Sequence, residues 1–455
     1  VYYPYILRTF GKRGSGILSE KTENELTDCL LGFRYWIDEP GNDAMWFWSE
    51  NHALMFHTCQ LLAGELFPDE VFTNSGLTGR QMQAKAKNML YDWFVTFRKE
   101  GFTEWNSSPY LPIDTLGFGS LYAFAQDPAM RELGREGMDF AYYLLAVHSQ
   151  QGIFASSSGR TYIKEQFGNW SNCPSGLSWI GYGYGVPGHA GKGITSYCLS
   201  DYEPPKEFAQ WFSIPRGKEM ICQTTQGNDG YVDLYTYKTA DYMMTSANDF
   251  HPGEPGHQEN PFQLTFNAVA QLWVTHPGER VLFGAARPSY WAGNGTLPKV
   301  NQYKAFAGLI YDIAPEHPVD FTHLYLPSME FDRCEVEGKW AFVQLGSAYA
   351  AVYCSNGMRM QDFGSNKDRE CIAEGRRCIW LVRAAQADEF AAFEDFKAAM
   401  RGAALDADAE GRRYRFVDPI YGELRCQWGE TLYVNDAPMQ YSGFDNYGKL
   451  TMQEK

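Results

Sequence analysis

The spacing of apolar side chains changes once along the chain, and this change constrains the fold more than any other feature. Up to about residue 212, apolar side chains recur every three or four residues, as on the buried face of an α-helix. From about Gly217 they alternate with polar ones, as in half-buried strands. The 455 residues therefore predict a multidomain α+β protein, with a helical domain over residues 1–215 and an antiparallel β-sandwich over residues 216–455.

The helical half predicts several long helices followed by a long loop. The expected helices are Thr22–Ile37, a helix capped by Ser49 and running to Phe67, Thr78–Lys99, Leu111–Ala125, Met130–His148 and a short Lys206–Phe212. Helices joined by short turns form αα-hairpins, which assemble into a bundle, a solenoid or a toroid. Residues 153–193 are rich in Ser, Gly, Trp and Tyr and predict a long loop with a functional role.

The second half predicts antiparallel strands. Trp340–Leu345 and Ala348–Cys354 flank Gly346-Ser347, which is the spacing of a two-residue hairpin turn. Further strands are expected at Tyr231–Tyr237, Phe262–Phe266 and Leu424–Trp428, and one helix at Ala387–Ala403. Alternating strands of this kind bury one face each, so two stacked sheets are expected.

Charge and composition exclude several functional classes. The formal charge of −16 argues against a general nucleic-acid binder, and no apolar run approaches the roughly 18 residues of a membrane span. The ten cysteines include no Cys-x-x-Cys, so most are expected to be buried free thiols. The start at Val1, with neither Met nor a signal-like segment, suggests a processed or trimmed chain; a secreted or periplasmic location is slightly favoured.

Aromatic residues are abundant, with 13 Trp, 29 Tyr and 30 Phe, and flat aromatic faces are how proteins hold sugar rings. The segment Trp46–His52 places Glu50, Asn51 and His52 in the first turn of a predicted helix, beside unpaired backbone N–H groups that favour an anion. The alternative is that Glu50 matches the helix dipole and His52 is a buried histidine with a structural partner.

Two further segments carry groups suited to an acidic sugar. Glu104–Tyr110 offers Trp105, Asn106 and Tyr110, that is, a ring, an amide and a phenol, in a loop between two helices. Arg160 and Tyr162 lie in the block 151–200, whose three basic residues and one acid give a local charge of +2. An arginine can grip a carboxylate or sulfate through two parallel hydrogen bonds. Ordinary loops with a packed Trp or an exposed Arg are the alternative.

A segment between two predicted strands combines histidines and acids. Asp249, His251, Glu254, His257 and Glu259 are residue types that bind zinc or calcium, although their spacing matches no metal motif. No cofactor is required by the sequence, and a structural divalent metal here stays open beside a catalytic role for His251.

The order of these features resembles the polysaccharide lyases built from a helical toroid and a β-sandwich, which include the heparinase II/III-like and alginate lyase groups. An Asn-His pair opens a helix, a Tyr follows 58 residues after the His, and a further His enters the β domain. The resemblance implies an (α/α) toroid, here with fewer helices than a complete one. It also implies a uronic-acid polysaccharide or oligosaccharide as the partner.

The resemblance further implies β-elimination with roles for named residues. Asn51 would neutralise the uronate carboxylate, Tyr110 would act as the acid and is also a candidate base, and His52 or His251 would assist or serve as the base. Arg160, Tyr162 and Asn106 would bind the chain, with Trp105 as a stacking platform. The residues leave two other functions open: a glycoside hydrolase using carboxylates among Glu50, Glu104 and Asp114, and a glycan-binding protein without catalysis.

Overall fold

The computed structural model describes residues 1–167, 172–187, 192–227, 230–282 and 284–455. The chain divides into two compact units, and each unit gathers segments that are separate in the sequence. The first unit contains Val1–Gly101, Tyr110–Tyr143 and Ala190–Lys206. The second contains Phe102–Pro109, Leu144–His189 and Glu207–Lys455. The second unit therefore includes two segments that precede β3 (Lys218–Gln226) in the sequence.

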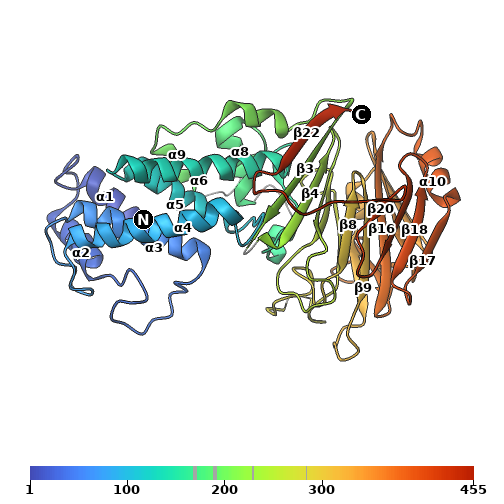
Figure 1. The fold of residues 1–455 in the computed structure, drawn as a ribbon, viewed down its shortest axis with the longest axis horizontal. Coiled ribbons are helices and arrows are strands. Elements are labelled where there is room, and N and C mark those ends of the chain that lie inside the picture. Colours follow the sequence, from blue (N-terminus) through green and yellow to red (C-terminus); the bar gives the residue numbers. More distant parts are fainter. Residues whose placement is uncertain (168–171, 188–191, 228–229, 283) are drawn as a thin grey trace. The chain divides into compact units, whose positions relative to one another are not determined.

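The first unit is helical, as predicted (Figure 1). Thr78 begins the longest helix with a capping box, in which its side chain and that of Gln81 each bond the other's backbone N–H. The helices are α1 (Tyr2–Phe10), α2 (Glu20–Gly32), α3 (Glu50–Leu66), α4 (Gly79–Glu100), α5 (Leu111–Phe124), the first part of α6 (Pro128–Val147) and α9 (Ile194–Cys198).

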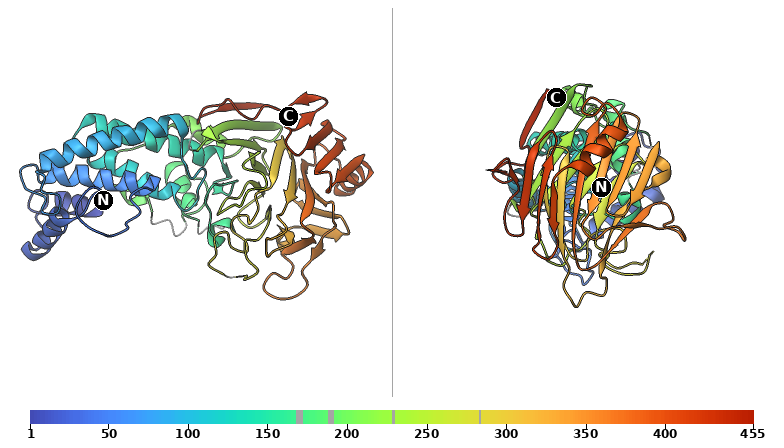
Figure 2. Two further views of the ribbon diagram at one scale, coloured as in Figure 1. Left: turned by 60° about the horizontal axis from the view of Figure 1, so that its bottom comes forward. Right: turned by 90° about the vertical axis from the view of Figure 1, so that its right-hand side faces the viewer.

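Helices α3 and α5 run in the same direction. Near their N-terminal ends, a side chain at Gly117 of α5 would collide with Leu54 of α3. At their C-terminal ends, the backbone N–H of Gln126 donates to Glu65 at 3.0 Å. Helix α4 runs antiparallel to α3, because the indole of Trp93 donates to the Glu50 carbonyl near the start of α3 at 3.1 Å. These are the predicted αα-hairpins in series (Figure 2), while closure into a toroid stays a prediction.

The second unit contains antiparallel sheets. The largest has the strand order β14-β15-β10-β7-β6-β5-β4-β3-β22, the next β11-β12-β13-β16-β9-β8, a third β17-β18-β19-β20-β21, and β1-β2 form a small ribbon. The bounds are β1 (Ser149–Gln150), β2 (Ile153–Phe154), β3 (Lys218–Gln226), β4 (Val232–Lys238), β5 (Met243–Asn248), β6 (Phe262–Thr265), β7 (Gln271–Thr275), β8 (Lys299–Tyr303), β9 (Phe306–Asp312), β10 (Phe321–Tyr325), β11 (Arg333–Glu337), β12 (Trp340–Leu345), β13 (Ala348–Cys354), β14 (Arg359–Met360), β15 (Glu370–Glu374), β16 (Arg377–Gln386), β17 (Leu405–Asp408), β18 (Arg413–Asp418), β19 (Gly422–Gln427), β20 (Tyr433–Val434), β21 (Ala437–Pro438) and β22 (Lys449–Glu454).

The two largest sheets share one hydrophobic core, and Figure 1 shows β3 and β4 in one layer beside β8, β9 and β16 in the next. Tyr311 of β9 donates its hydroxyl to the Val274 carbonyl of β7 at 3.1 Å and so links the two layers. The hairpin predicted around Gly346 is confirmed, with Leu345 opposite Ala348 and Gly346 at φ 56°.

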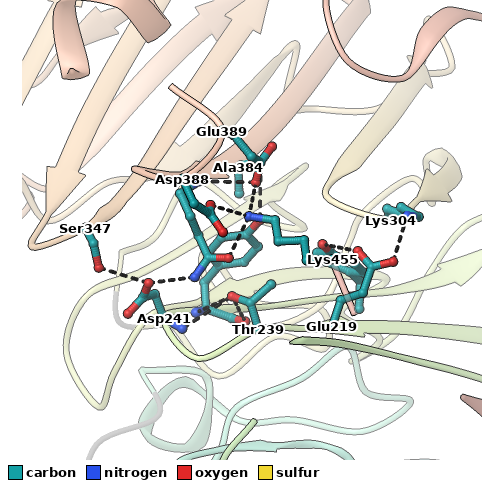
Figure 3. A network of polar contacts seen from close by, with 12 residues as sticks. Glu219, Thr239, Asp241, Lys304, Ser347, Ala384, Asp388, Glu389 and Lys455 are labelled. Atoms are coloured by element: carbon teal, nitrogen blue, oxygen red, sulfur yellow. Dashed lines mark hydrogen bonds and ion pairs between the residues drawn. The ribbon is translucent and has the colours of Figure 1, made fainter. Parts of the chain in front are cut away.

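Polar networks hold strand ends of this unit together (Figure 3). Asp241 accepts hydrogen bonds from Ser347 Oγ at 2.9 Å and from Gln386 Nε2 at 2.6 Å. Lys455 Nζ lies 2.7 Å from Asp388 and 2.6 Å from Glu389. Each carboxylate therefore meets a donor, which is what a partly buried charge requires.

Four predicted elements differ in the structure. The predicted loop 153–193 contains helices α7 (Ile163–Gln166) and α8 (Cys173–Tyr182), while its residues 168–171 and 188–191 lie outside the described part. The helix predicted from Ala387 is α10 (Phe393–Gly402) and begins later, and the helix predicted to reach Ile37 ends at Gly32. The segment Lys206–Trp211 is a 3-10 helix, and η3 covers Ser328–Glu330. Within the described residues, no helix is long and apolar enough to cross a membrane.

Candidate active site

The start of α3 presents the predicted Asn-His pair. Ser49 takes the N-cap position with extended backbone, and its hydroxyl donates to Asn51 Oδ1 at 3.2 Å. Accepting this bond fixes the amide plane of Asn51 and leaves its NH₂ group as a donor. Asn51 is 5% exposed. The helix start thus holds a buried, oriented amide beside the N–H groups that a helix leaves unpaired.

His52 contacts the loop that precedes the helix. Its Nδ1 lies 3.2 Å from the backbone oxygen of Trp46, a residue at φ 54°. A carbonyl oxygen can only accept, so this contact places the proton of the neutral ring on Nδ1 and leaves Nε2 as the basic nitrogen. Trp46 and Trp48 are 61% and 65% exposed. The open indole faces near the Asn-His pair therefore belong to these two residues, and the sequence analysis did not assign them a sugar-binding role.

Tyr110 is the N-cap residue of α5 and is half-buried. Its backbone oxygen accepts from the N–H groups of Ile113 at 2.8 Å and Asp114 at 3.0 Å, which starts the helix. Since α3 and α5 are parallel, Asn51 and Tyr110 stand at the same end of the helical unit. The structure therefore confirms that Asn51 lies in a first helix turn and shows that Tyr110, predicted in the preceding loop, is the N-cap of the next helix. The catalytic roles of both residues stay predictions.

In the second unit, the structure brings together two predicted segments. The backbone N–H of Gly159 donates to the Trp105 carbonyl at 2.8 Å, and Ser107 Oγ donates to the Arg160 carbonyl at 3.0 Å. Arg160 Nη1 lies 3.7 Å from Glu104 Oε1. Burial raises the pKa of the Glu104 carboxyl, and the Arg160 charge opposes that rise.

The prediction that Trp105 offers a stacking platform is wrong for this structure. The indole is 1% exposed and belongs to a hydrophobic cluster. It lies so close to Gly159 that a side chain there would meet the indole Nε1 at 2.7 Å, and its ring centroid lies 5.6 Å from that of Phe250. Trp105 therefore packs the loop from inside, because two other segments cover its faces.

Asn106 is held in an unfavourable state. Its backbone has φ 48°, and the residue is 2% exposed. Neither the oxygen nor the nitrogen of its amide has a hydrogen-bond partner among the described residues. A buried amide without partners and a left-handed backbone each cost free energy, and such features concentrate at functional sites. The binding role of Asn106 stays a prediction.

His251 lies on a strained loop of the same unit. Asp249 has φ 49° and His251 has φ 46°. The side chain of His251 is 44% exposed, with Nδ1 3.3 Å from Glu254 Oε2. Its ring packs edge-on against Phe250 at 4.8 Å, and Phe250 contacts Trp105. The His251 loop and the Trp105 loop are therefore neighbours.

The metal-site alternative for this loop is not supported by the geometry. Asp249 forms an ion pair with Lys299 and accepts from Asn301 Nδ2 at 3.2 Å, so its carboxylate is already neutralised. Glu259 accepts from the backbone N–H of His257 at 2.5 Å. Across the part of the chain that the structure describes, no three His, Cys, Asp or Glu side chains stand together as metal ligands.

Tyr162 lies between two cations. The guanidinium carbon of Arg160 is 5.9 Å from the centroid of its ring, and that of Arg287 is 5.5 Å from it. Sequence reasoning found Arg160 and Tyr162 but missed Arg287, which is more than 120 residues further along the chain. No local signal distinguishes Arg287 from any other surface arginine.

The predicted site residues thus fall into two groups. The structure places Asn51, His52 and Tyr110 in the first unit, and Trp105, Asn106, Arg160, Tyr162 and His251 in the second. Within the first unit, the parallel helices bring the first three to one end. Within the second, loop contacts connect the other five.

Comparison with known proteins gives structural likeness at low identity. No family model matches the sequence, and no curated protein matches it significantly. Among solved structures, the chain is similar to heparinase III, with a TM-score of 0.40 and 9% identity, over 95% of this chain and 74% of that one. It is also similar to a mutant of the heparan sulfate lyase HepC from Pedobacter heparinus, with a TM-score of 0.40 and 10% identity, over 92% of this chain and 70% of that one.

Proposed function

We propose that the protein is a polysaccharide lyase that cleaves a uronic-acid-containing chain by β-elimination. The observation that carries the proposal is the parallel arrangement of α3 and α5, which sets the oriented amide of Asn51 and the phenol of Tyr110 at the same end of one unit. An amide donor and a phenol are the groups that this reaction needs beside a sugar carboxylate.

The chemistry begins with a weakly acidic proton. The C5–H of a uronate is hard to remove while the neighbouring carboxylate keeps its full charge. The NH₂ of Asn51 donates to that carboxylate and stabilises the negative charge that develops as the proton leaves. The proton goes to a base, the C4–O bond breaks, a C4=C5 double bond forms, and the departing oxygen receives a proton from an acid.

The protein offers two kinds of group for these proton transfers. The basic Nε2 of His52 is on the same helix turn as Asn51, and the phenol of Tyr110 serves as the acid that protonates the leaving oxygen. His251 in the second unit is the alternative base. Arg160, Tyr162 and Asn106 are assigned to binding the acidic chain.

One assay tests the reaction type. The protein is incubated with uronate-containing polysaccharides, and near-ultraviolet absorbance is followed together with reducing ends. Elimination raises both signals because it leaves a conjugated double bond. Reducing ends without absorbance would contradict the proposal and indicate hydrolysis, and a glycan-binding protein would raise neither signal.

The matched variants are Tyr110→Phe and Tyr91→Phe. Tyr110→Phe removes only the hydroxyl, and we expect turnover to fall about 100-fold or more while substrate binding persists. Tyr91 is 43% exposed on α4 of the same unit, and its variant should keep full activity. Retained activity in Tyr110→Phe would remove this phenol from the mechanism.

One observation favours a second function, glycoside hydrolysis. Burial raises the pKa of Glu104, as a carboxylic acid that protonates a glycosidic oxygen requires. Under that mechanism, Glu104→Gln would abolish the release of reducing ends. Under the lyase mechanism, the same variant would retain the elimination reaction.

A further inference from the structure

We propose that a pocket beside Tyr162 in the second unit binds an anionic sugar residue of the substrate, with Arg287 as the residue that recognises its charge. The pocket has a volume of about 470 Å³, within the range of small-molecule sites. Its polar lining consists of Tyr162, Lys164, Gln258, Arg287 and Ser289. The inference rests on the proposed function for the class of ligand.

The first argument is that Arg287 lacks an acidic partner. Arg160 and Arg287 both pack on the ring of Tyr162. Arg160 has Glu104 beside it, whereas Arg287 forms no ion pair with any acid among the described residues. Lys164 is paired with Glu165 at 3.1 Å, and Glu279 at the pocket wall accepts from the backbone N–H of Ala286 at 3.0 Å. Arg287 is therefore the lining cation that can bind an anionic group of a ligand through parallel hydrogen bonds.

The second argument is an unpartnered acceptor in the pocket lining. Gln258 is 3% exposed, and its Nε2 donates to the Thr161 carbonyl at 2.8 Å. That bond fixes the amide plane, and the remaining Oε1 has no hydrogen-bond partner in the described chain. A buried acceptor without a donor costs free energy. A sugar hydroxyl supplies the missing donor.

Together the two groups specify the ligand class. Arg287 can bind an anionic substituent, and Gln258 Oε1 can accept a hydrogen bond from an O–H group on the same molecule. Inorganic sulfate, which carries no O–H group at neutral pH, meets only the first requirement, and a neutral sugar meets only the second. A sugar ring that carries a carboxylate or a sulfate ester meets both.

The experiment measures binding and turnover separately on the full chain. Calorimetry gives the Kd of an unsulfated glucuronate-containing tetrasaccharide, of a sulfated counterpart, and of a carboxyl-reduced neutral counterpart. We expect Arg287→Gln to weaken binding of at least one anionic tetrasaccharide about tenfold, with little change for the neutral one. A loss confined to the sulfated ligand identifies a sulfate subsite, and a loss for both anionic ligands identifies a carboxylate subsite. Arg287→Lys should restore part of the affinity.

Arg359→Gln is the matched control. Arg359 is exposed in the same unit and donates to Gln361 Oε1 at 3.0 Å, and its loss changes the net charge equally. Equal weakening by both variants, or no weakening by Arg287→Gln, overturns the inference. If no substrate is cleaved but binding still depends on Arg287, the proposed lyase function is wrong and the proposed binding role of the pocket is supported. If elimination occurs with Kd and KM unchanged in Arg287→Gln, the lyase function is supported and the binding role of the pocket is wrong.

Discussion

Two short segments of this protein contain similar residue types, a tryptophan and an asparagine, but differ in how far those side chains are exposed to solvent. Residues 46–52 in the first unit contain Trp46, Trp48 and Asn51, and residues 104–106 in the second contain Trp105 and Asn106. The first segment leaves its indoles 61–65% exposed and gives its asparagine a hydrogen bond from Ser49. The second buries its indole to 1% exposure, and its amide has no hydrogen-bond partner within the described part of the chain.

The difference arises from what packs against each segment. The chain before α3 leads directly into a regular helix, whose first turn orders Asn51 locally. The 104–106 segment is covered by Gly159 and Phe250, which come from distant parts of the chain. Residue type therefore tells which groups are present, whereas packing decides which face of each group a ligand can reach.

The largest expected effect is a difference in the free energy of unfolding between variants of Trp105 and Trp48. Trp105→Ala should lower the free energy of unfolding by about 3–5 kcal/mol, because it empties a large buried site. Trp48→Ala should leave stability within about 0.5 kcal/mol, because the indole is exposed, and should raise the KM for an oligosaccharide several-fold. Urea unfolding of both variants measures the contrast. Equal destabilisation by the two substitutions would contradict the difference in packing between the two tryptophans.

The asparagines should differ in which kinetic parameter they change. Asn51→Ala should lower kcat about 100- to 1000-fold, as expected for loss of a donor to developing negative charge. Asn106→Ala should act mainly on KM. Steady-state kinetics on one polysaccharide separates the two effects. A decrease in kcat of similar size in both variants would show that Asn106 also acts in the catalytic step.

Acid should destabilise the second unit more than the first. Burial lowers the pKa of His148 and His276 to about 3 in the second unit, and that of His57 to about 4 in the first, from an ordinary value of 6.5. Below pH 6.5 the unfolded chain therefore binds protons that the folded chain does not, so stability falls as pH falls towards 4. Each histidine contributes about 1.4 kcal/mol per pH unit in this window.

Thermal unfolding at pH 7 and pH 5 measures this dependence. The double variant His148→Asn/His276→Asn should lose more of the acid-induced decrease in Tm than His57→Asn does. An unchanged decrease in the double variant would show that other groups control the acid response.

The smallest effect concerns the strain at Asn106. Asn106→Gly removes a buried unpartnered amide and accepts φ 48° freely. We expect the free energy of unfolding to rise by about 1 kcal/mol, while affinity for the oligosaccharide falls. Asn435→Gly is a control for backbone strain, since Asn435 has φ 48° but its amide is hydrogen-bonded. A stable Asn106→Gly protein with undiminished affinity would show that the amide has no binding role.

Local sequence signals predicted regular elements well. The helix start at Ser49 follows from a capping residue, and the helices expected from Thr78 and from Leu111 follow from the spacing of their apolar side chains. The hairpin at Gly346-Ser347 follows from its turn residues. The missed helix α8 begins Cys-Pro-Ser-Gly, and its Gly and Ser content lowers intrinsic helix propensity, so its tertiary environment overrides the local preference.

The candidate site was only partly predictable, for a similar reason. Asn51, Tyr110, Arg160 and His251 stand out because their neighbours form short recognisable patterns. Arg287 and the partnerless Oε1 of Gln258 carry no such pattern. Their binding role is inferred from which charged groups and hydrogen-bond partners lie beside them, and those groups come from residues far apart in the sequence.

The sequence by itself determined where helices give way to strands and which helix turn holds Asn51, because periodicity and capping act over a few residues. Only the tertiary structure decided that Trp105 is buried, that α3 and α5 are parallel, and that Arg287 joins Arg160 at Tyr162. Burial and electrostatic balance are sums over everything within a few ångströms, and the chain order does not reveal which segments those will be.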